Sequence, residues 1–202
     1  MSDLGFIHRF VPGKSTRTLL LLHGTGGDEN DLVDLGRALD PDAALLSPRG
    51  KVLENGAPRF FRRLAEGVFD EKDVIARAHE LAQFVDDAAK QYKIDMNDLV
   101  AVGYSNGANI AAAMLLLGLA KFPQAILFRA MVPLSKIDVP NLKALRVFIS
   151  AGQFDPIAQV PIAQRLAQLL ESAGAKVTLQ IQPGGHDLSP RDVTDAREWL
   201  AR

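Results

Sequence analysis

Short apolar runs alternate along this chain with longer stretches in which apolar residues return every three or four positions. Residues 19–22 are consecutive leucines followed by a glycine-rich stretch, as expected of a strand that is buried on both faces of a sheet. The longer stretches predict helices that each bury one stripe. Because parallel neighbouring strands need a crossover connection, the alternation predicts an α/β fold with a mainly parallel sheet and helices on both of its faces.

The expected sheet has about seven strands. An antiparallel edge hairpin is predicted where residues 6–11 connect to the leucine strand through Pro12 and Gly13. Residues 48–69 fit neither a helix nor a strand and are predicted to form a long ordered loop, which in compact domains is commonly functional. The other predicted strands are residues 44–47, 99–103, 130–134, 147–150 and 177–181, and the predicted helices contain the apolar positions of residues 74–88 and 162–170.

Composition narrows the class of protein. We expect residues 1–202 to form a single domain, since this length is enough to bury one core. Lys plus Arg (23) nearly balance Asp plus Glu (24), which argues against nucleic-acid binding. The absence of cysteine excludes disulfides, thiolate zinc sites and cysteine nucleophiles. Residues 108–120 are too short an apolar run to span a membrane, and residues 1–10 do not resemble a signal peptide, so we expect a cytoplasmic protein without membrane insertion.

The pentapeptide Gly103-Tyr104-Ser105-Asn106-Gly107 directly follows one predicted strand and precedes a helix that begins near residue 108. A serine on such a tight strand-to-helix turn is lifted clear of the sheet edge. The two glycines are needed because side chains there would collide with the neighbouring helix and strand. Ser105 is therefore the predicted nucleophile of a serine hydrolase.

A serine hydroxyl is a poor nucleophile until a base takes its proton, so a histidine must lie near the strand ends. His186 follows two glycines directly after the last predicted strand, and it is the predicted base. The other histidines have better structural explanations. His8 lies on the edge strand, His79 lies inside a predicted helix, and His23 ends the first core strand and braces its loop.

The base must be oriented by a carboxylate that accepts from its second ring nitrogen. Asp155 follows the strand at residues 147–150 and is the predicted partner, with Asp187 and Asp138 as weaker alternatives. The order serine, aspartate, histidine along the chain is that of the α/β-hydrolase fold. All three residues follow predicted strands, and sites in open α/β sheets are built at the carboxyl ends of strands.

The negative charge of a tetrahedral intermediate requires nearby hydrogen-bond donors. The backbone amides of Thr25, in the glycine-rich loop after the first core strand, and of Asn106, after the nucleophile, are the predicted oxyanion hole. Gly26 remains an alternative to Thr25, since a sequence does not orient an amide.

The chain resembles the phospholipase/carboxylesterase or acyl-protein-thioesterase-like serine hydrolases over most of its length, in particular their small bacterial members. The resemblance implies hydrolysis of carboxylic esters or thioesters without a metal or organic cofactor, and often a homodimer. Many eukaryotic members have Gln where this chain has Asn106, and no insertion here is long enough for a large lid. The matching motifs are residues 22–29, 103–107, 152–156 and 184–186, with residues 47–50 and 59–62 similar to a bacterial subgroup that includes hydrolases linked to quinone or aromatic-compound stress.

The predicted loop at residues 48–69 supplies candidate substrate-binding residues. Arg59, Phe61 and Arg62 could shape an acyl or aromatic pocket, with Arg59 or Arg62 holding either an anionic group or the acids Asp28 and Glu29. A structural ion pair at the base of the loop is the alternative role of these arginines. We thus expect an esterase that acts on small-molecule esters. Its rivals are a dienelactone-hydrolase-like lactonase, whose usual cysteine nucleophile is missing here, and a non-catalytic ligand-binding member of the fold.

Overall fold

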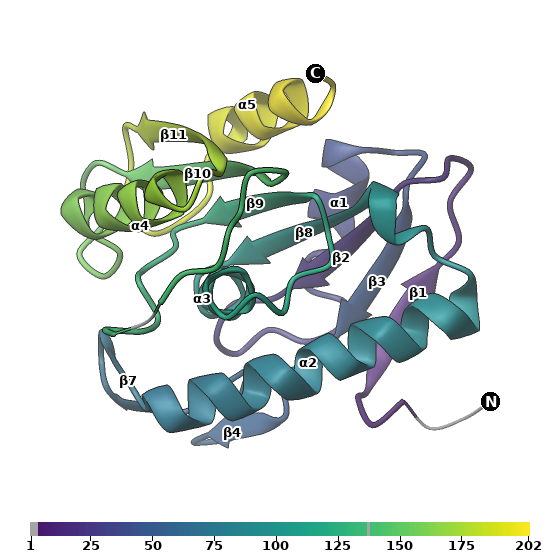
Figure 1. Cartoon of the computed structure of the whole chain (residues 1–202), viewed down its shortest axis with the longest axis horizontal. Helices are drawn as coiled ribbons and strands as arrows, with labels where there is room; N and C mark the ends of the chain where they lie inside the picture. The colour runs from purple at the N-terminus through teal and green to yellow at the C-terminus, as the bar shows by residue number, and fades with distance from the viewer. Residues whose placement is uncertain (1–3, 137) are drawn as a thin grey trace.

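A computed structural model describes residues 4–136 and 138–202, and within these residues the centre of the molecule is a seven-stranded sheet (Figure 1). The edge strand β1 is antiparallel to its neighbour, and all the other neighbouring strands are parallel. The predicted α/β architecture and the expected strand number are therefore confirmed. The strand order across the sheet is β1 (His8–Val11), β3 (Ala44–Pro48), β2 (Thr18–Leu22), β8 (Leu99–Tyr104), β9 (Gln124–Phe128), β10 (Arg146–Gly152) and β11 (Lys176–Gln182).

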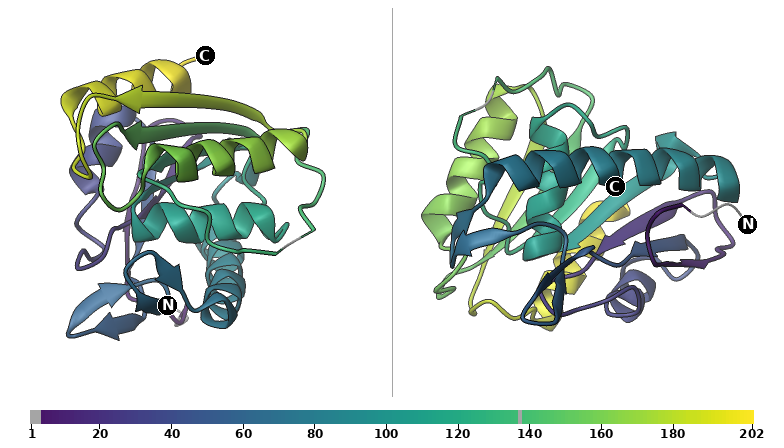
Figure 2. Two further views of the ribbon diagram at one scale, coloured as in Figure 1. Left: turned by 90° about the vertical axis from the view of Figure 1, so that its left-hand side faces the viewer. Right: turned by 90° about the horizontal axis from the view of Figure 1, so that it is seen from below.

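Helices cover both faces of this sheet, as the sequence predicts (Figures 1 and 2). Helices α2 (Glu71–Tyr92), α3 (Asn106–Leu116) and α4 (Val160–Ser172) pack on one face. Helices α1 (Val33–Leu39) and α5 (Pro190–Leu200) pack on the other, and the short 3-10 helix η1 (Met96–Asp98) leads into β8. Successive leucines of β2 point alternately into the two cores, which explains why the strand is apolar at every position.

The strand predicted at residues 130–134 is wrong. The structure places β9 earlier, at Gln124–Phe128, and the next residue, Arg129, leaves the strand with a φ of 57°. Residues 130–134 are largely buried beyond the end of the strand without strand structure. Their apolar character reflects burial rather than pairing, and Pro133 has no N–H to offer a neighbouring strand.

The predicted hairpin between residues 6–11 and the leucine strand is also wrong. β1 does lie antiparallel at the edge of the sheet, but it pairs with β3 in a register that places Phe10 opposite Leu46. Both sides of β2 are already occupied by β3 and β8. The connection is held instead at the start of β3, where the amide of Lys14 donates to the carbonyl of Asp42 over 2.7 Å.

Residues 48–69, here called the 48–69 segment, form two small hairpins instead of the predicted long loop. The first joins β4 (Val52–Glu54) to β5 (Ala57–Arg59), and the second joins β6 (Arg63–Ala65) to β7 (Val68–Phe69). The first turn is Asn55-Gly56, with φ values of 53° and 84°, a strong hairpin signal that the sequence analysis did not use. The hairpins lie beside the first half of α2 and are separate from the central sheet (Figures 1 and 2).

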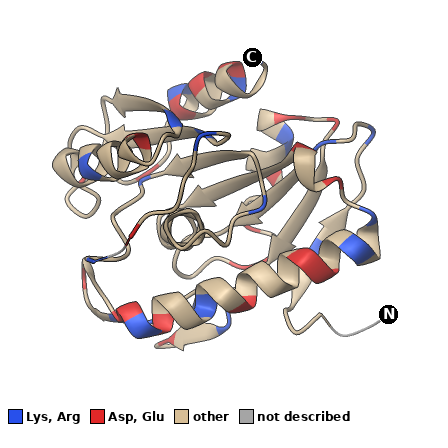
Figure 3. Ribbon diagram, viewed as in Figure 1, with Lys and Arg blue, Asp and Glu red and all other residues tan. Residues whose placement is uncertain are grey.

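Charged residues of both signs are interspersed along α2 and α5 (Figure 3). None of the helices within residues 4–136 and 138–202 has both the length and the apolarity that crossing a bilayer demands. The sequence-based expectation about residues 1–10 falls partly on residues 1–3, which lie outside the described residues.

Candidate active site

Ser105 lies on a tight turn between β8 and α3, at the carboxyl edge of the sheet. Its φ of 51° and ψ of −113° fall outside the helix and strand regions, and such strained residues cluster at functional sites. The flanking glycines are required by lack of space. A Cβ on Gly103 would lie 2.6 Å from the backbone of Ala108. A Cβ on Gly107 would lie 1.9 Å from the carbonyl oxygen of Leu22. The turn therefore has the geometry that the pentapeptide predicts.

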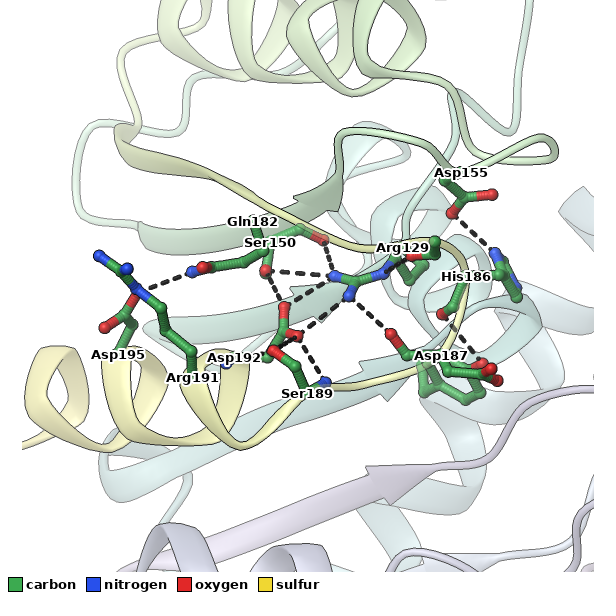
Figure 4. Close-up of polar contacts among 12 residues, drawn as sticks. Arg129, Ser150, Asp155, Gln182, His186, Asp187, Ser189, Arg191, Asp192 and Asp195 are labelled. Carbon is green, nitrogen blue, oxygen red and sulfur yellow. Dashed lines mark hydrogen bonds and ion pairs between the residues drawn. The ribbon is translucent and has the colours of Figure 1, made fainter.

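A continuous chain of hydrogen bonds joins the predicted triad. The hydroxyl of Ser105 donates to Nε2 of His186 over 2.9 Å, and Nδ1 of His186 donates to Oδ2 of Asp155 over 2.8 Å (Figure 4 shows the second bond). The buried carboxylate of Asp155 also accepts from the backbone amides of Ile157 and Ala158, at 2.8 and 3.0 Å. These amides fix the carboxylate, which in turn orients the imidazole so that it can accept the serine proton.

The two alternative carboxylates lie outside this chain of hydrogen bonds. Asp187 follows His186 directly, and its backbone carbonyl accepts from Nη2 of Arg129 at 2.8 Å. Asp138 is exposed in the loop before β10. The geometry therefore favours Asp155 as the orienting group.

The predicted oxyanion-hole residues both line the cavity that contains Ser105. Asn106 is the first residue of α3, where backbone N–H groups have no partner within the helix. Gly26, the alternative backbone donor to Thr25, is not available, because its amide already donates to the carbonyl of Pro58 over 2.9 Å. Thr25 and Asn106 thus remain the predicted donors.

Hydrogen bonds anchor the 48–69 segment to the strand ends. Besides the bond from Gly26, the side-chain oxygen of Asn106 accepts from the amide of Phe60 over 2.7 Å. This contact gives the Asn106 side chain a structural role that the sequence left open. Nε2 of the buried His23 accepts from the amide of Gly50 over 2.9 Å, while its Nδ1 donates to the carbonyl of Gly24. Burial lowers the pKa of His23, in keeping with the neutral imidazole that this pair of bonds requires.

The cavity above Ser105 has a volume of about 220 Å³. Among the residues that the structure describes, no group of three or more His, Cys, Asp or Glu side chains is arranged to hold a metal ion. The residues that line the cavity are Thr25, Arg59, Arg63, Gly67, Phe69, Tyr104, Ser105, Asn106, Asn109, Arg129, Met131, Ile157 and His186.

Of the predicted substrate-binding residues, only Arg59 is among those that line the cavity. Phe61 is fully buried and packs edge-on against Phe69, with ring centroids 5.1 Å apart. Arg62 is exposed, and its guanidinium binds the carboxylate of Asp70 at the start of α2. Its position outside the cavity does not support a substrate-binding role.

The hypothesis that Arg59 or Arg62 holds the acids of the first loop is wrong. Arg49 does so instead, with Nε and Nη2 donating to the two carboxylate oxygens of Glu29 over 2.6 and 2.8 Å. Arg49 also lies 3.7 Å from Asp28. The hydrogen bond from Arg49 is the main cause of the lowered pKa of Glu29.

One side of the cavity is lined by Arg59 and Arg63 from the two hairpins. Together with Glu54, the acid that pairs with both, they are here called the arginine wall. Arg63 binds the carboxylate of Glu54 through Nε at 2.8 Å and Nη2 at 2.7 Å, and Nη1 of Arg59 lies 3.3 Å from the same carboxylate. Nη1 of Arg59 also donates to the hydroxyl of Thr25 over 2.8 Å. Arg63 was not predicted as a site residue, because its position depends on the second hairpin, which the sequence did not predict.

Another side of the cavity, here called the histidine wall, is built on a buried cluster of Arg129, Ser150 and Asp192 (Figure 4). Arg129 and Asp192 form a two-pronged ion pair, with N···O distances of 2.8 and 3.0 Å, and both side chains are fully buried. The hydroxyl of Ser150 also donates to Asp192. Burial acts to raise the pKa of Asp192, but hydrogen bonds from Arg129, Ser150 and Ser189 outweigh it and lower that pKa to about 2.

This cluster holds the loop that carries His186. Arg129 donates through Nε to the carbonyl of Gly185 over 2.9 Å and through Nη2 to the carbonyl of Asp187 over 2.8 Å (Figure 4). The hydroxyl of Tyr104 donates to the carbonyl of His186 itself over 3.2 Å. Three consecutive carbonyls are thereby tethered. Arg129 was missed by sequence analysis, although a charged residue directly after a buried strand is a usable signal.

Comparison with known proteins finds relatives that cover nearly the whole of this chain. A protein from Bacillus subtilis (strain 168), MhqD, whose name designates it a hydrolase, is 49% identical over 192 residues, which cover 95% of this chain and 96% of that protein. The solved Bacillus cereus carboxylesterase is 50% identical, with a TM-score of 0.94 over 97% of this chain and 93% of that one.

More distant solved structures share the same fold. A carboxylesterase from Mesorhizobium loti is 34% identical, with a TM-score of 0.95 over 100% of this chain and 97% of that one. The structure of YahD with malic acid is 31% identical, with a TM-score of 0.92 over 97% and 98% of the two chains. The α/β-hydrolase fold and a carboxylesterase-type hydrolase are confirmed. The family model described as Phospholipase/Carboxylesterase matches residues 12–202, and the chain belongs to that family.

Proposed function

We propose that this chain is a serine esterase that cleaves carboxylic esters through an acyl-enzyme on Ser105, with all parts of the reaction within one α/β-hydrolase domain. The observation that supports it most is the chain of hydrogen bonds from Ser105 through His186 to Asp155, which opens onto the cavity. Membership of a family that includes carboxylesterases supports the same class of reaction.

In the first half of the reaction, Oγ of Ser105 attacks the carbonyl carbon of the ester while Nε2 of His186 takes the hydroxyl proton. The carbonyl π electrons move onto oxygen, and the amides of Thr25 and Asn106 donate to the resulting oxyanion. The intermediate then collapses, its bond to the leaving oxygen breaks, and the departing alcohol takes the proton from His186.

In the second half, water attacks the acyl-enzyme and gives a proton to the same nitrogen of His186. The second tetrahedral intermediate collapses with release of the acid, and Oγ of Ser105 recovers its proton from His186. Asp155 stabilises the imidazolium in both halves. A cavity of about 220 Å³ supports short acyl or aromatic esters as substrates, and the same chemistry would act on thioesters.

Replacement of the nucleophile tests this proposal directly. Ser105→Ala is expected to lower kcat on p-nitrophenyl acetate and butyrate by on the order of 10⁴- to 10⁶-fold while the protein stays folded. Ser172→Ala, at an exposed position in the last turn of α4, is the matched control and should keep full activity.

Covalent labelling separates a catalyst from a ligand-binding member of the fold. A fluorophosphonate probe should label the wild-type enzyme, and mass spectrometry of its peptides should find the adduct on Ser105. An active Ser105→Ala variant, or an adduct on another residue, would show that the nucleophile has been assigned wrongly.

A further inference from the structure

The arginine wall carries more positive charge than its acid can neutralise. Arg59 and Arg63 share the carboxylate of Glu54, and in the part of the chain that the structure describes no second carboxylate pairs with either guanidinium. Glu66 is the acid nearest to them in sequence on the second hairpin, and it is exposed in the turn between β6 and β7. Two cations therefore face this side of the cavity, and a single carboxylate pairs with both of them.

This excess positive charge lies at the cavity in which a ligand would bind. Both arginines line the cavity that contains Ser105, and Arg59 is only 3% exposed. Burial lowers the pKa of Arg59, but arginine keeps its charge in proteins, so a desolvated cation remains. A buried guanidinium that is only partly neutralised attracts an anion more strongly than an exposed one does.

The chemistry of the wall suits an oxyanion such as a carboxylate. A guanidinium presents its N–H groups in a planar fork that matches the two oxygens of a carboxylate. The cavity is not charged throughout, since Phe69, Met131 and Ile157 also line it and offer apolar surface to a short carbon chain. A ligand that suits both parts has a carboxylate joined by a short apolar spacer to the ester.

A direct contact joins the arginine wall to the predicted oxyanion hole. Arg59 donates to the hydroxyl of Thr25, whose backbone amide is a proposed donor to the oxyanion. A substrate carboxylate bound to the arginine wall would therefore be separated from the ester carbonyl carbon by only a few covalent bonds of the substrate. We propose that the preferred substrates are esters with a carboxylate on a short spacer, bound by Arg63 and Arg59. This inference rests on the proposed esterase function.

Two pairs of esters test the proposal on the wild-type enzyme, with acid release followed in a pH-stat. Monomethyl glutarate and methyl valerate differ by a carboxylate in place of a methyl group on the acyl side. O-acetyl lactate and isopropyl acetate differ in the same way on the alcohol side. At least one anionic ester should exceed its neutral partner in kcat/KM by about tenfold, the effect of one charge-assisted hydrogen bond. Added salt should reduce the preference.

Variants of the wall should move this preference in opposite directions. Arg63→Gln should raise KM for the favoured anionic ester by about tenfold and change KM for its neutral partner little. Glu54→Gln removes the competing carboxylate and should lower KM for the anionic ester. Arg77→Gln is the matched control, because Arg77 also binds carboxylates and is 30% exposed, against 32% for Arg63, but lies on α2 outside the cavity.

The outcomes separate this inference from the function on which it rests. Hydrolysis of both neutral esters that depends on Ser105, with neither anionic partner favoured more than about twofold, would overturn the carboxylate preference and leave the esterase intact. A KM for the anionic ester that is equal in the wild type, Arg63→Gln and Glu54→Gln would also overturn it. Hydrolysis that does not require Ser105 would instead contradict the proposed function.

Discussion

The two walls of the cavity use the same residue types and differ in how their charges are matched. On the histidine wall, Arg129 and Asp192 are fully buried and paired one to one, and polar neighbours use the remaining donors and acceptors. On the arginine wall, two guanidiniums share the single paired carboxylate of Glu54 within the described chain, and that carboxylate is 28% exposed. A matched and buried cluster is suited to holding a loop, whereas an unmatched cluster at a cavity is suited to a ligand.

The walls also differ in how the backbone supports them. Arg129 directly follows β9, and Ser150 lies within the neighbouring strand β10. Asp192 lies in the first turn of α5, where it forms a capping box with Ser189. The arginine wall lies on hairpins that are separate from the central sheet. Substitutions on the histidine wall should therefore lower the stability of the protein strongly, and substitutions on the arginine wall should lower it only slightly.

The largest expected effect is that of Arg129→Met. The substitution leaves the carboxylate of Asp192 buried without its cation, and it should lower the free energy of unfolding by about 3–5 kcal/mol in urea titrations. Because two carbonyls beside His186 lose their donor, kcat should also fall, by roughly 100-fold, with a smaller change in KM.

A double variant separates these two consequences. Arg129→Met combined with Asp192→Leu replaces the ion pair by apolar side chains and should recover most of the lost stability. The carbonyls of Gly185 and Asp187 would still lack their donor, so kcat should stay low. If kcat recovered together with stability, Arg129 would support the fold without positioning His186.

The pH dependence of stability is the next effect in size. The pKa of Asp192 is about 2 in the folded protein, below its ordinary value of 3.8, so the ionised form is favoured by folding. Its contribution to stability is complete above pH 3.8 and is lost as the pH falls from about 4 toward 2; at 1.36 kcal/mol per pKa unit this amounts to about 2 kcal/mol.

Urea titrations of the wild type and of Asp192→Asn over this pH range provide the measurement. The difference between their free energies of unfolding should shrink as the pH is lowered through this window, since only the wild type loses this contribution. Parallel curves would mean that the Arg129 pair does not lower the pKa of Asp192.

The smallest expected effect belongs to the arginine wall. Arg63→Gln should lower the free energy of unfolding by less than about 1 kcal/mol, because Arg63 and Glu54 are both partly exposed. The difference should decrease further in high salt. A loss comparable to that of Arg129→Met would make this ion pair structural and remove the contrast between the two walls.

Much of the fold could be predicted because its signals are local. The buried parallel strands are apolar at nearly every position, and the glycines around Ser105 are demanded by the backbone of their near neighbours. Predictions of strands were wrong where buried apolar residues do not pair in a strand, and where a strand does not pair with the next strand in sequence. Residues 130–134 are largely buried without being a strand, and β1 pairs with β3 rather than with the next strand in sequence.

The site was predictable to the extent that its residues follow strands. Ser105, Asp155 and His186 each come after a strand, and the structure brings these three side chains into hydrogen-bond contact, while their catalytic roles stay predictions. Arg129 and Asp192 are 63 residues apart, and no local pattern couples an arginine to one particular acid at that separation. Local sequence also does not specify which arginine of the 48–69 segment faces the cavity. Arg62 was predicted as a substrate-binding residue for this reason, although its neighbour Arg63 lines the cavity.

The separation of β4–β7 from the central sheet has a consequence for how such a protein can change over generations. Within the described chain, these strands pair only with one another. The segment is attached to the rest of the molecule by contacts that include those of Gly50, Pro58 and Phe60. Insertions and deletions at the hairpin tips, such as at Asn55, leave the register of the central sheet undisturbed. The proposed substrate selectivity can therefore change during evolution while the strands that precede Ser105, Asp155 and His186 stay unaltered.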